Sequence, residues 1–154
     1  MSAAAAIAEF PNKLEKIFLN TDNALNKQGI YALNFFMLGV PHTVIIDDYL
    51  PLKKATGKTL FAHPSKSGAI WMAILEKAFA KYHGNYAHIV GGAPQLAIRT
   101  LVGGPYKEYY HSKANSLSAD ALWDAIHKHD MGNDILSAST HGGSDSEKDD
   151  KGLV

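Results

Sequence analysis

The chain has 154 residues, a length that indicates one domain or part of a larger one. Lys and Arg together number 15, as do Asp and Glu, so the formal net charge is zero. That balance argues against nucleic acid or an anionic membrane as the main partner, because both favour basic surfaces. The absence of cysteine excludes a disulfide framework and a thiolate metal site within these residues, and it fits a cytoplasmic location. No apolar run approaches the roughly 20 residues of a membrane-spanning helix.

Two short helices and a hairpin are expected in the first third of the chain. Residues 3–8 are almost all alanine, a strong helix former. Apolar residues at helical spacing predict a second helix over residues 13–19. Residues 30–38 and 43–46 are rich in aromatic and β-branched side chains, and Gly39 between them could make a turn. These two segments therefore predict a β-hairpin.

The clearest expected helix covers residues 68–82. Its apolar side chains fall on one stripe with a period near 3.6, which predicts the buried face: Trp71, Ile74, Leu75, Ala78, Phe79 and Tyr82. The opposite, outer face is expected to carry Ala73, Lys77 and Ala80. Gly84 is expected to end the helix through the usual glycine cap. A short strand is expected before the helix, at residues 59–62.

The last third of the chain is expected to contain two helices and two strands. Pro94 suits a helix start, so a helix is expected over residues 94–101. Ser118 is expected to cap a helix that runs to residue 131. Its inward-facing residues are expected to be Ala121, Leu122, Ala125 and Ile126. The expected strands are residues 106–111 and 135–140, and the Gly-, Ser- and charge-rich residues 142–152 predict a mobile loop.

Three short motifs suggest ligand sites, but each one lacks a required feature. Gly57-Lys58-Thr59 resembles the end of a phosphate-binding loop, yet Leu52 stands where an earlier glycine is needed. Residues 145–150 resemble a calcium-binding loop, yet an aspartate stands at the sixth position, where glycine makes the turn. His127 and His129 are two apart on an expected helix, so they point in different directions. The favoured interpretations are a turn, a solvated acidic loop and surface histidines.

Asp47 and Asp48 are a candidate acid–base pair at the end of an apolar strand. Consecutive residues of a strand face opposite sides, so the favoured interpretation gives one aspartate to turn amides and the other to solvent. Composition alone does not exclude a Ser-His-Asp site, but no Gly-x-Ser-x-Gly sequence exposes a serine. The residues by themselves therefore show no complete active site.

Several stretches together resemble one protein family. Residues 44–51 contain Asp-Asp-Tyr-Leu-Pro, and residues 71–86 read Trp-Met-Ala-Ile-Leu-Glu-Lys-Ala-Phe-Ala-Lys-Tyr-His-Gly-Asn-Tyr. Two glycine pairs follow, at residues 91–92 and 103–104. These stretches are similar to the calpain catalytic domain. That family has a strand ending in Val-x-Asp-Asp-x-Leu-Pro and a signature helix of Phe-Trp-x-x-Leu-Leu-Glu-Lys-Ala-Tyr-Ala-Lys-x-x-Gly-x-Tyr. The resemblance spans nearly the whole chain.

The resemblance implies an α+β, papain-like cysteine-proteinase fold. Residues 1–102 would belong to its helical first half, and residues 103–154 would begin its β-rich second half, with the barrel incomplete. Residues 1–8 resemble the small-residue run that follows the family's catalytic Cys-Trp. Residues 151–154 resemble the stretch that precedes its catalytic His. We therefore expect the interval between nucleophile and base, without the catalytic Cys, His and Asn.

The implied function is a calcium-dependent cysteine endopeptidase that cuts protein substrates. The chain by itself is expected to be inactive, because it lacks the thiolate that attacks the peptide. The family's signature helix carries a carboxylate that helps to hold calcium, and Glu76 is the matching residue. The alternative is that Glu76 pairs with Lys77 or with solvent; the two are equal for a full-length parent, and the alternative is favoured for these residues alone. The alternative function is a non-catalytic, calpain-like module that binds protein partners.

Overall fold

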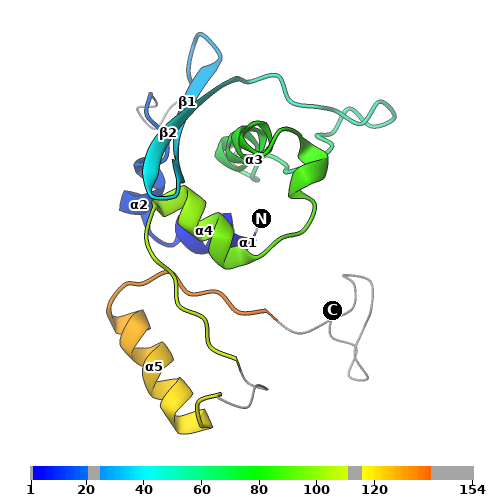
Figure 1. The fold of residues 1–154 in the computed structure, drawn as a ribbon. Coiled ribbons are helices and arrows are strands. Elements are labelled where there is room, and N and C mark those ends of the chain that lie inside the picture. Colours follow the sequence, from blue (N-terminus) through cyan, green and yellow to red (C-terminus); the bar gives the residue numbers. More distant parts are fainter. Residues whose placement is uncertain (1, 21–24, 111–115, 140–154) are drawn as a thin grey trace.

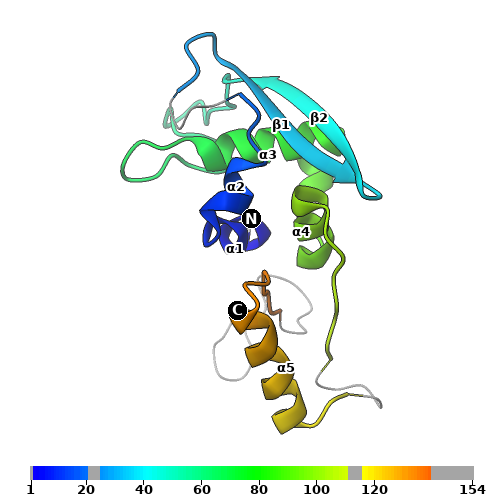
Figure 2. The same cartoon turned by 90° about the vertical axis from the view of Figure 1, so that its left-hand side faces the viewer.

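The computed structural model describes residues 2–20, 25–110 and 116–139. Within these ranges the elements, in chain order, are α1 (Ser2–Ala8), α2 (Pro11–Glu15), β1 (Ile30–Met37), β2 (Val40–Asp47), α3 (Trp71–Tyr82), the 3-10 helix η1 (Tyr86–Ile89), α4 (Pro94–Val102) and α5 (Ala119–Met131). Helices and an antiparallel pair of strands thus occur together, as the α+β class requires. Figures 1 and 2 show the hairpin curving around α3, with α1, α2 and α4 beneath it and α5 apart from the other helices.

The predicted hairpin is confirmed. β1 and β2 pair from Ile30 opposite Asp47 to Met37 opposite Val40. The two turn residues both have positive φ, 51° at Leu38 and 85° at Gly39, which is the backbone of a tight type I′ turn. Alternate side chains of the hairpin are buried, and they form its inner face: Tyr31, Leu33, Phe35, Val44 and Ile46.

The second predicted helix is wrong at both boundaries. α2 covers Pro11–Glu15, because proline suits the first helical position, and it ends four residues before the expected residue 19. The chain then runs along the free edge of β1. The Leu19 N–H donates to the Ala32 carbonyl at 2.8 Å, and the Asn34 N–H donates to the Ile17 carbonyl at 2.8 Å. Pairing with a neighbouring strand therefore prevails over the helical spacing of residues 13–19.

α3 is confirmed, and it is buried on two sides. Ile74, Leu75 and Ala78 lie in the core as predicted, although the helix begins at residue 71 rather than 68. Ala73 and Ala80 were expected on the outer face, and both are buried. That prediction is wrong because residues 50–62 and η1 cover the side of α3 opposite the hairpin. The His83–Gly84 end is confirmed.

A single hydrophobic core holds the hairpin together with α1, α3 and α4. Its buried members come from α1, β1, β2, α3, α4 and the second residue after α2, namely Ala4, Ile7, Ile17, Tyr31, Leu33, Phe35, Val44, Ile46, Ile74, Leu75, Ala78 and Leu101. α4 matches its prediction and ends one residue later, at Val102. Gly103 then caps it at a φ of 74°, and a Cβ there would lie 2.7 Å from the Phe36 ring. Only glycine fits this contact between α4 and β1 without a shift.

Three predicted strands are wrong in the part of the chain that the structure describes. Residues 59–62 form one isolated bridge, between Leu52 and Thr59, and no strand. Residues 106–110 and 135–139 are not in strands either. Local sequence favoured strands there, but a strand needs a partner for its backbone groups. Residues 111 and 140, and the predicted loop at 142–152, lie outside the described residues.

α5 forms as predicted, but half of its expected inner face is exposed. The Ser118 side chain accepts the Ala121 N–H, which confirms the predicted cap. Leu122 is buried, whereas Ala121 and Ile126 are exposed, so their predicted burial is wrong. The helix lies away from the main core. Among the described residues, no helix is both long and apolar enough to span a bilayer.

Candidate functional site

α3 holds the predicted site residue Glu76 against the segment that precedes the helix. The Ala62 N–H donates to Glu76 Oε2 at 2.7 Å. Glu76 is half-buried. Within the described residues, the bond from the Ala62 N–H is the one hydrogen bond that its carboxylate makes. The alternative pairing of Glu76 with Lys77 is wrong. Lys77 instead reaches Asp47 and the Tyr49 carbonyl, across the hairpin side of α3.

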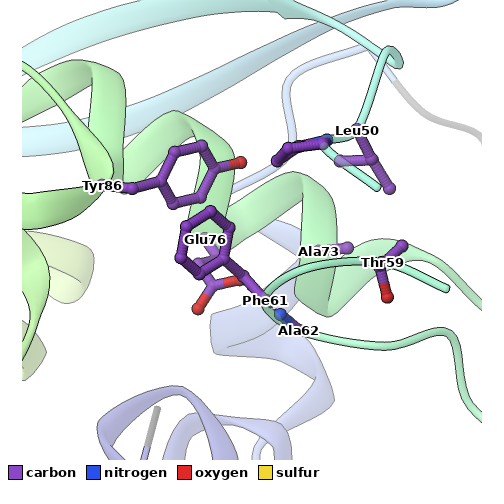
Figure 3. Close-up of a pocket in the computed structure, with 8 residues that line it drawn as sticks. Leu50, Thr59, Phe61, Ala62, Ala73, Glu76 and Tyr86 are labelled. Carbon is purple, nitrogen blue, oxygen red and sulfur yellow. Dashed lines mark hydrogen bonds between the residues drawn. The ribbon is translucent and has the colours of Figure 1, made fainter. Parts of the chain in front are cut away.

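Two stacked rings lie beside this carboxylate. The Phe61 and Tyr86 rings are 4.1 Å apart at an angle of 7°, and Figure 3 shows them on the side of α3 that carries Glu76. A small cavity of about 10 Å³ lies next to these groups, lined by Leu50, Pro51, Thr59, Phe61, Ala62, Ala73, Glu76 and Tyr86. It has room for about one water molecule. A substrate pocket is typically about 300–1,000 Å³, so this cavity is too small to enclose a substrate.

The surroundings of Tyr86 keep its phenol protonated. Burial raises the pKa of Tyr86 above its ordinary value, and the nearby Glu76 carboxylate raises that pKa further. Both causes disfavour a phenolate in this place. Tyr86 therefore acts here as a neutral aromatic ring.

The Glu76 carboxylate suits calcium chemically, but it supplies only one of the ligands that a calcium ion needs. Calcium takes six to eight oxygen ligands, with several carboxylates among them in most sites. Among residues 2–20, 25–110 and 116–139, no three His, Cys, Asp or Glu side chains are grouped to hold a metal ion. Hard carboxylate oxygen is the right ligand type, so Glu76 would supply one ligand to a calcium ion and the other described residues would supply none grouped with it.

Asp47 and Asp48 do not form an acid–base pair. Asp47 Oδ1 accepts the Tyr49 N–H at 2.8 Å and binds Lys77 Nζ at 2.5 Å. The bond from Lys77, followed by that from the Tyr49 amide, holds the pKa of Asp47 below its ordinary 3.8. Asp48 is exposed, beside Gly29. The predicted division, with one aspartate on a turn amide and one at the surface, is confirmed.

One histidine of α5 takes part in an arrangement that the sequence did not predict. His129 Nδ1 donates to Asp134 Oδ2 at 2.7 Å, and its Nε2 lies 3.3 Å from the Tyr109 hydroxyl. His127, two residues earlier on α5, is exposed. That the two histidines share no ion stays a prediction. Gly57 sits in a turn, where its N–H donates to the Lys53 carbonyl, rather than in a phosphate-binding loop. Residues 145–150 lie outside the described residues.

Comparison with known proteins identifies the family to which the chain belongs. A family model described as calpain family cysteine protease matches residues 1–154, so the chain belongs to the calpain family of cysteine proteases. It is 31% identical over 157 residues to the calpain-type cysteine protease DEK1 of Zea mays, covering 100% of this chain and 7% of that protein.

Animal relatives match a shorter part of the chain. The calpain-1 catalytic subunit of Mus musculus is 38% identical over 88 residues, which are 57% of this chain and 12% of that protein. The calpain-2 catalytic subunit of Homo sapiens is 37% identical over 95 residues, 62% of this chain and 13% of that protein. The chain thus spans less than a fifth of the length of the curated relatives that it matches.

Proposed function

We propose that this chain is part of the core of a calcium-dependent cysteine endopeptidase that cuts protein substrates in the cytoplasm. The observation that carries the proposal is the calpain-family match over residues 1–154. The lack of cysteine fits a reducing compartment. Glu76 is the residue proposed to reach calcium, which would supply a fixed positive charge beside α3.

These 154 residues are proposed to build the scaffold of the reaction rather than to perform its covalent step. A cysteine protease attacks the peptide carbonyl with a thiolate, and this sequence contains no thiol. The chain by itself is therefore proposed to be inactive. Its contribution is to hold the hairpin, α3 and α4 in one core, on which the reacting groups of a complete enzyme could be placed.

A papain-like division into residues 1–102 and 103–154 is part of this proposal. Two features support it. The buried residues of the core cluster all precede residue 103, and α5 lies apart from them. The extended residues 103–110 connect the two parts. On this proposal, α5 belongs to the second half, and its exposed Trp123 and Ile126 face chain that completes that half.

A peptide-hydrolysis assay tests the proposed function. The complete product of the gene that encodes these residues is assayed on a fluorogenic peptide, with and without calcium, beside the isolated 154-residue chain. We expect calcium-dependent turnover that a thiol reagent abolishes in the complete product, and none in the isolated chain. Turnover by the pure isolated chain that resists the thiol reagent would overturn the scaffold role.

The alternative is a non-catalytic module that binds proteins. Large apolar side chains at the surface favour it, above all Leu38, which is 86% exposed, and Tyr49, which is 83% exposed. An inactive complete product that still carries this fold would support the binding module and contradict the protease.

A further inference from the structure

The chain between β2 and α3 concentrates positive charge at the surface. Residues 49–75 contain four lysines and neither Asp nor Glu, although the chain as a whole has no net charge. Three of these lysines, Lys53, Lys54 and Lys58, lie in one exposed turn, the 53–58 turn. None of the three forms an ion pair within the described residues. In Figure 1 the chain between β2 and α3 extends outward before it returns to α3. The turn therefore presents a local positive charge that the balanced composition does not reveal.

Backbone hydrogen bonds fold these residues into a compact turn. The Lys53 N–H donates to the Lys58 carbonyl at 2.8 Å, and the Gly57 N–H donates to the Lys53 carbonyl at 2.8 Å. Thr56 lies within the turn, and its N–H donates to the Lys53 carbonyl at 3.1 Å. A Cβ built on Gly57 would meet no atom within 4 Å, so the space beside Thr56 is open. Another protein can therefore approach this residue.

The hydroxyl of Thr56 lies among these lysines. Thr56 is exposed, and its Oγ1 accepts the Lys58 N–H at 3.4 Å. Lys53 and Lys54 stand three and two positions before it, in the sequence Lys-Lys-Ala-Thr. Among all serines and threonines of the sequence, Thr56 alone has Lys or Arg at both of these positions. Basophilic protein kinases select their substrates by that pattern of charge.

We propose that a basophilic protein kinase phosphorylates Thr56, and that the phosphate binds the neighbouring lysines and orders the 53–58 turn. In this reaction Thr56 Oγ1 forms a bond to the γ-phosphorus of a nucleoside triphosphate. The bond from that phosphorus to the bridging oxygen breaks, and the nucleoside diphosphate leaves. The hydroxyl proton passes to a carboxylate of the kinase, and the product carries a phosphothreonine.

The 53–58 turn can open for the kinase without disturbing the core. Peptides enter a kinase cleft in extended form, so the backbone bonds of Lys53 have to break. All six residues of the turn are exposed, and water replaces a lost partner there at little net cost. Thr59 is placed differently, because it is half-buried and its Oγ1 lies 2.5 Å from His63 Nδ1. The geometry therefore favours Thr56 over the next threonine.

A phosphate on Thr56 would meet its counter-charges in the same turn. It adds about −1.5 to −2 charge at pH 7 and three acceptor oxygens. Three lysines of the turn offset that charge, and no Asp or Glu of residues 49–75 repels it. Charge-assisted hydrogen bonds of this kind are stronger than neutral ones. The turn links two segments that pair at the bridge between Leu52 and Thr59 beside α3, so ordering it should also tighten their cover of that helix.

Phosphorylation of the complete gene product in vitro tests the acceptor. The protein is incubated with ATP and cyclic-AMP-dependent protein kinase, a basophilic probe, and modified residues are located by tandem mass spectrometry. We expect phosphate at position 56 in the wild type and in Thr56→Ser, and none there in Thr56→Ala. A peptide of residues 49–62 is treated in parallel. An unmodified Thr56 in the folded protein would overturn the proposal, and labelling of the peptide alone would show that the turn does not open.

Lysine variants test whether the charge pattern selects this threonine. The double variant Lys53→Ala with Lys54→Ala removes the pattern from an exposed turn. Lys66→Ala is the matched control, because Lys66 is an exposed lysine of the same acid-free segment. We expect the double variant to be phosphorylated roughly tenfold more slowly or worse, since one charge-assisted contact contributes about tenfold. Lys66→Ala should keep the wild-type rate, and equal rates in all three proteins would contradict selection by the lysines.

Hydrogen exchange tests the effect of the phosphate on the turn. Exchange of the backbone amides of residues 53–58 is followed by mass spectrometry before and after phosphorylation. We expect the phosphate to slow this exchange in the wild type, and to slow it less in Lys58→Ala, which lacks one counter-charge. Unchanged exchange would show that the phosphate does not order the turn and would contradict that half of the proposal. Neither measurement depends on peptide hydrolysis, so this inference and the proposed function can fail separately.

Discussion

Two lysines one turn apart on α3 bind the outer edge of β2. Lys77 Nζ lies 2.5 Å from Asp47 Oδ1 and donates to the Tyr49 carbonyl at 2.6 Å. Lys81 Nζ donates to the Ile45 carbonyl at 2.7 Å. A free strand edge is a template for pairing with another chain, and charged side chains placed along it oppose such pairing. These lysines therefore both attach α3 to the hairpin and protect its edge.

The pair of Asp47 and Lys77 makes stability depend on pH in a defined direction. Because the pKa of Asp47 is lowered in the folded chain, its contribution is present above the ordinary value of 3.8 and is lost as the pH falls through the lower folded pKa. Asp47→Asn should lower the melting temperature at neutral pH. The difference from the wild type should shrink between about pH 5 and pH 2.

Circular dichroism melts at a series of pH values measure this effect. Asp48→Asn is the matched control, because Asp48 is the next residue, is exposed and forms no ion pair within the described residues. Its melting temperature should follow that of the wild type more closely. A gap between Asp47→Asn and the wild type that stays constant down to pH 2 would show that the ionised carboxylate is not what stabilises the contact.

At the scale of elements, the hairpin turn carries a local conflict. Leu38 has a φ of 51°, in the left-handed region that usually takes Asn, Asp or Gly, and its side chain is 86% exposed. No burial of the side chain compensates for the strain. Leu38→Asn should therefore stabilise the chain by about 1 kcal/mol in urea unfolding, since left-handed backbone costs an ordinary residue roughly 1–2 kcal/mol.

Val40→Asn is the control for this prediction. Val40 is also exposed and apolar, but it begins β2 with no left-handed backbone. Asparagine there should be neutral or destabilising, because valine suits a strand better. If both variants raise stability equally, the gain comes from removing exposed apolar surface and not from the turn.

The elements that the sequence predicted well are those with strong local signals. The stripe on α3, the proline that starts α4 and the Ser118 cap of α5 each act within a few residues, so periodicity and capping rules suffice. The pairing of residues 17–19 with β1, and the burial of Ala73, depend on segments distant in sequence. Local patterns carry no information about such partners.

The candidate site likewise combines a residue that the sequence predicted with partners that it did not. The resemblance of the signature helix singled out Glu76, but not its partner. The partner is a backbone N–H, which every residue except proline possesses, so no side chain marks Ala62 as the donor. The stack of Phe61 on Tyr86 joins residues 25 positions apart, and neither aromatic residue belongs to a periodic pattern.

At the scale of the whole molecule, residues 133–135 form a joint between α5 and the body, that is, the hairpin with α1 to α4. Lys13 Nζ donates to the Asn133 carbonyl at 2.7 Å, and Ile135 packs partly buried against the core. Between them, Asp134 accepts from His129 on α5. The joint therefore holds the last turn of α5 on one side and α2 on the other.

Weakening this joint should release α5 without unfolding the body. Ile135→Ala removes about 1–2 kcal/mol of apolar packing, which raises the detached population about 5–30-fold. An isolated helix of 13 residues is marginal in water, so detachment exposes the bond after Lys128 to trypsin. The rate of that cleavage, followed by mass spectrometry, should rise while the melting temperature of the body changes little.

Leu136→Ala provides the comparison, because Leu136 is adjacent and 41% exposed. Its cleavage rate should stay near that of the wild type. Equal acceleration in both variants would place the attachment of α5 elsewhere.

Active-site titration tests most directly the claim that this chain belongs to a working calpain-type protease. The complete gene product is incubated with a peptidyl electrophile that traps a cysteine thiolate, with and without calcium, and its intact mass is measured. We predict one covalent adduct per molecule, formed only with calcium and located on a cysteine outside these 154 residues. An unmodified protein in calcium, or an adduct within these residues, would contradict it.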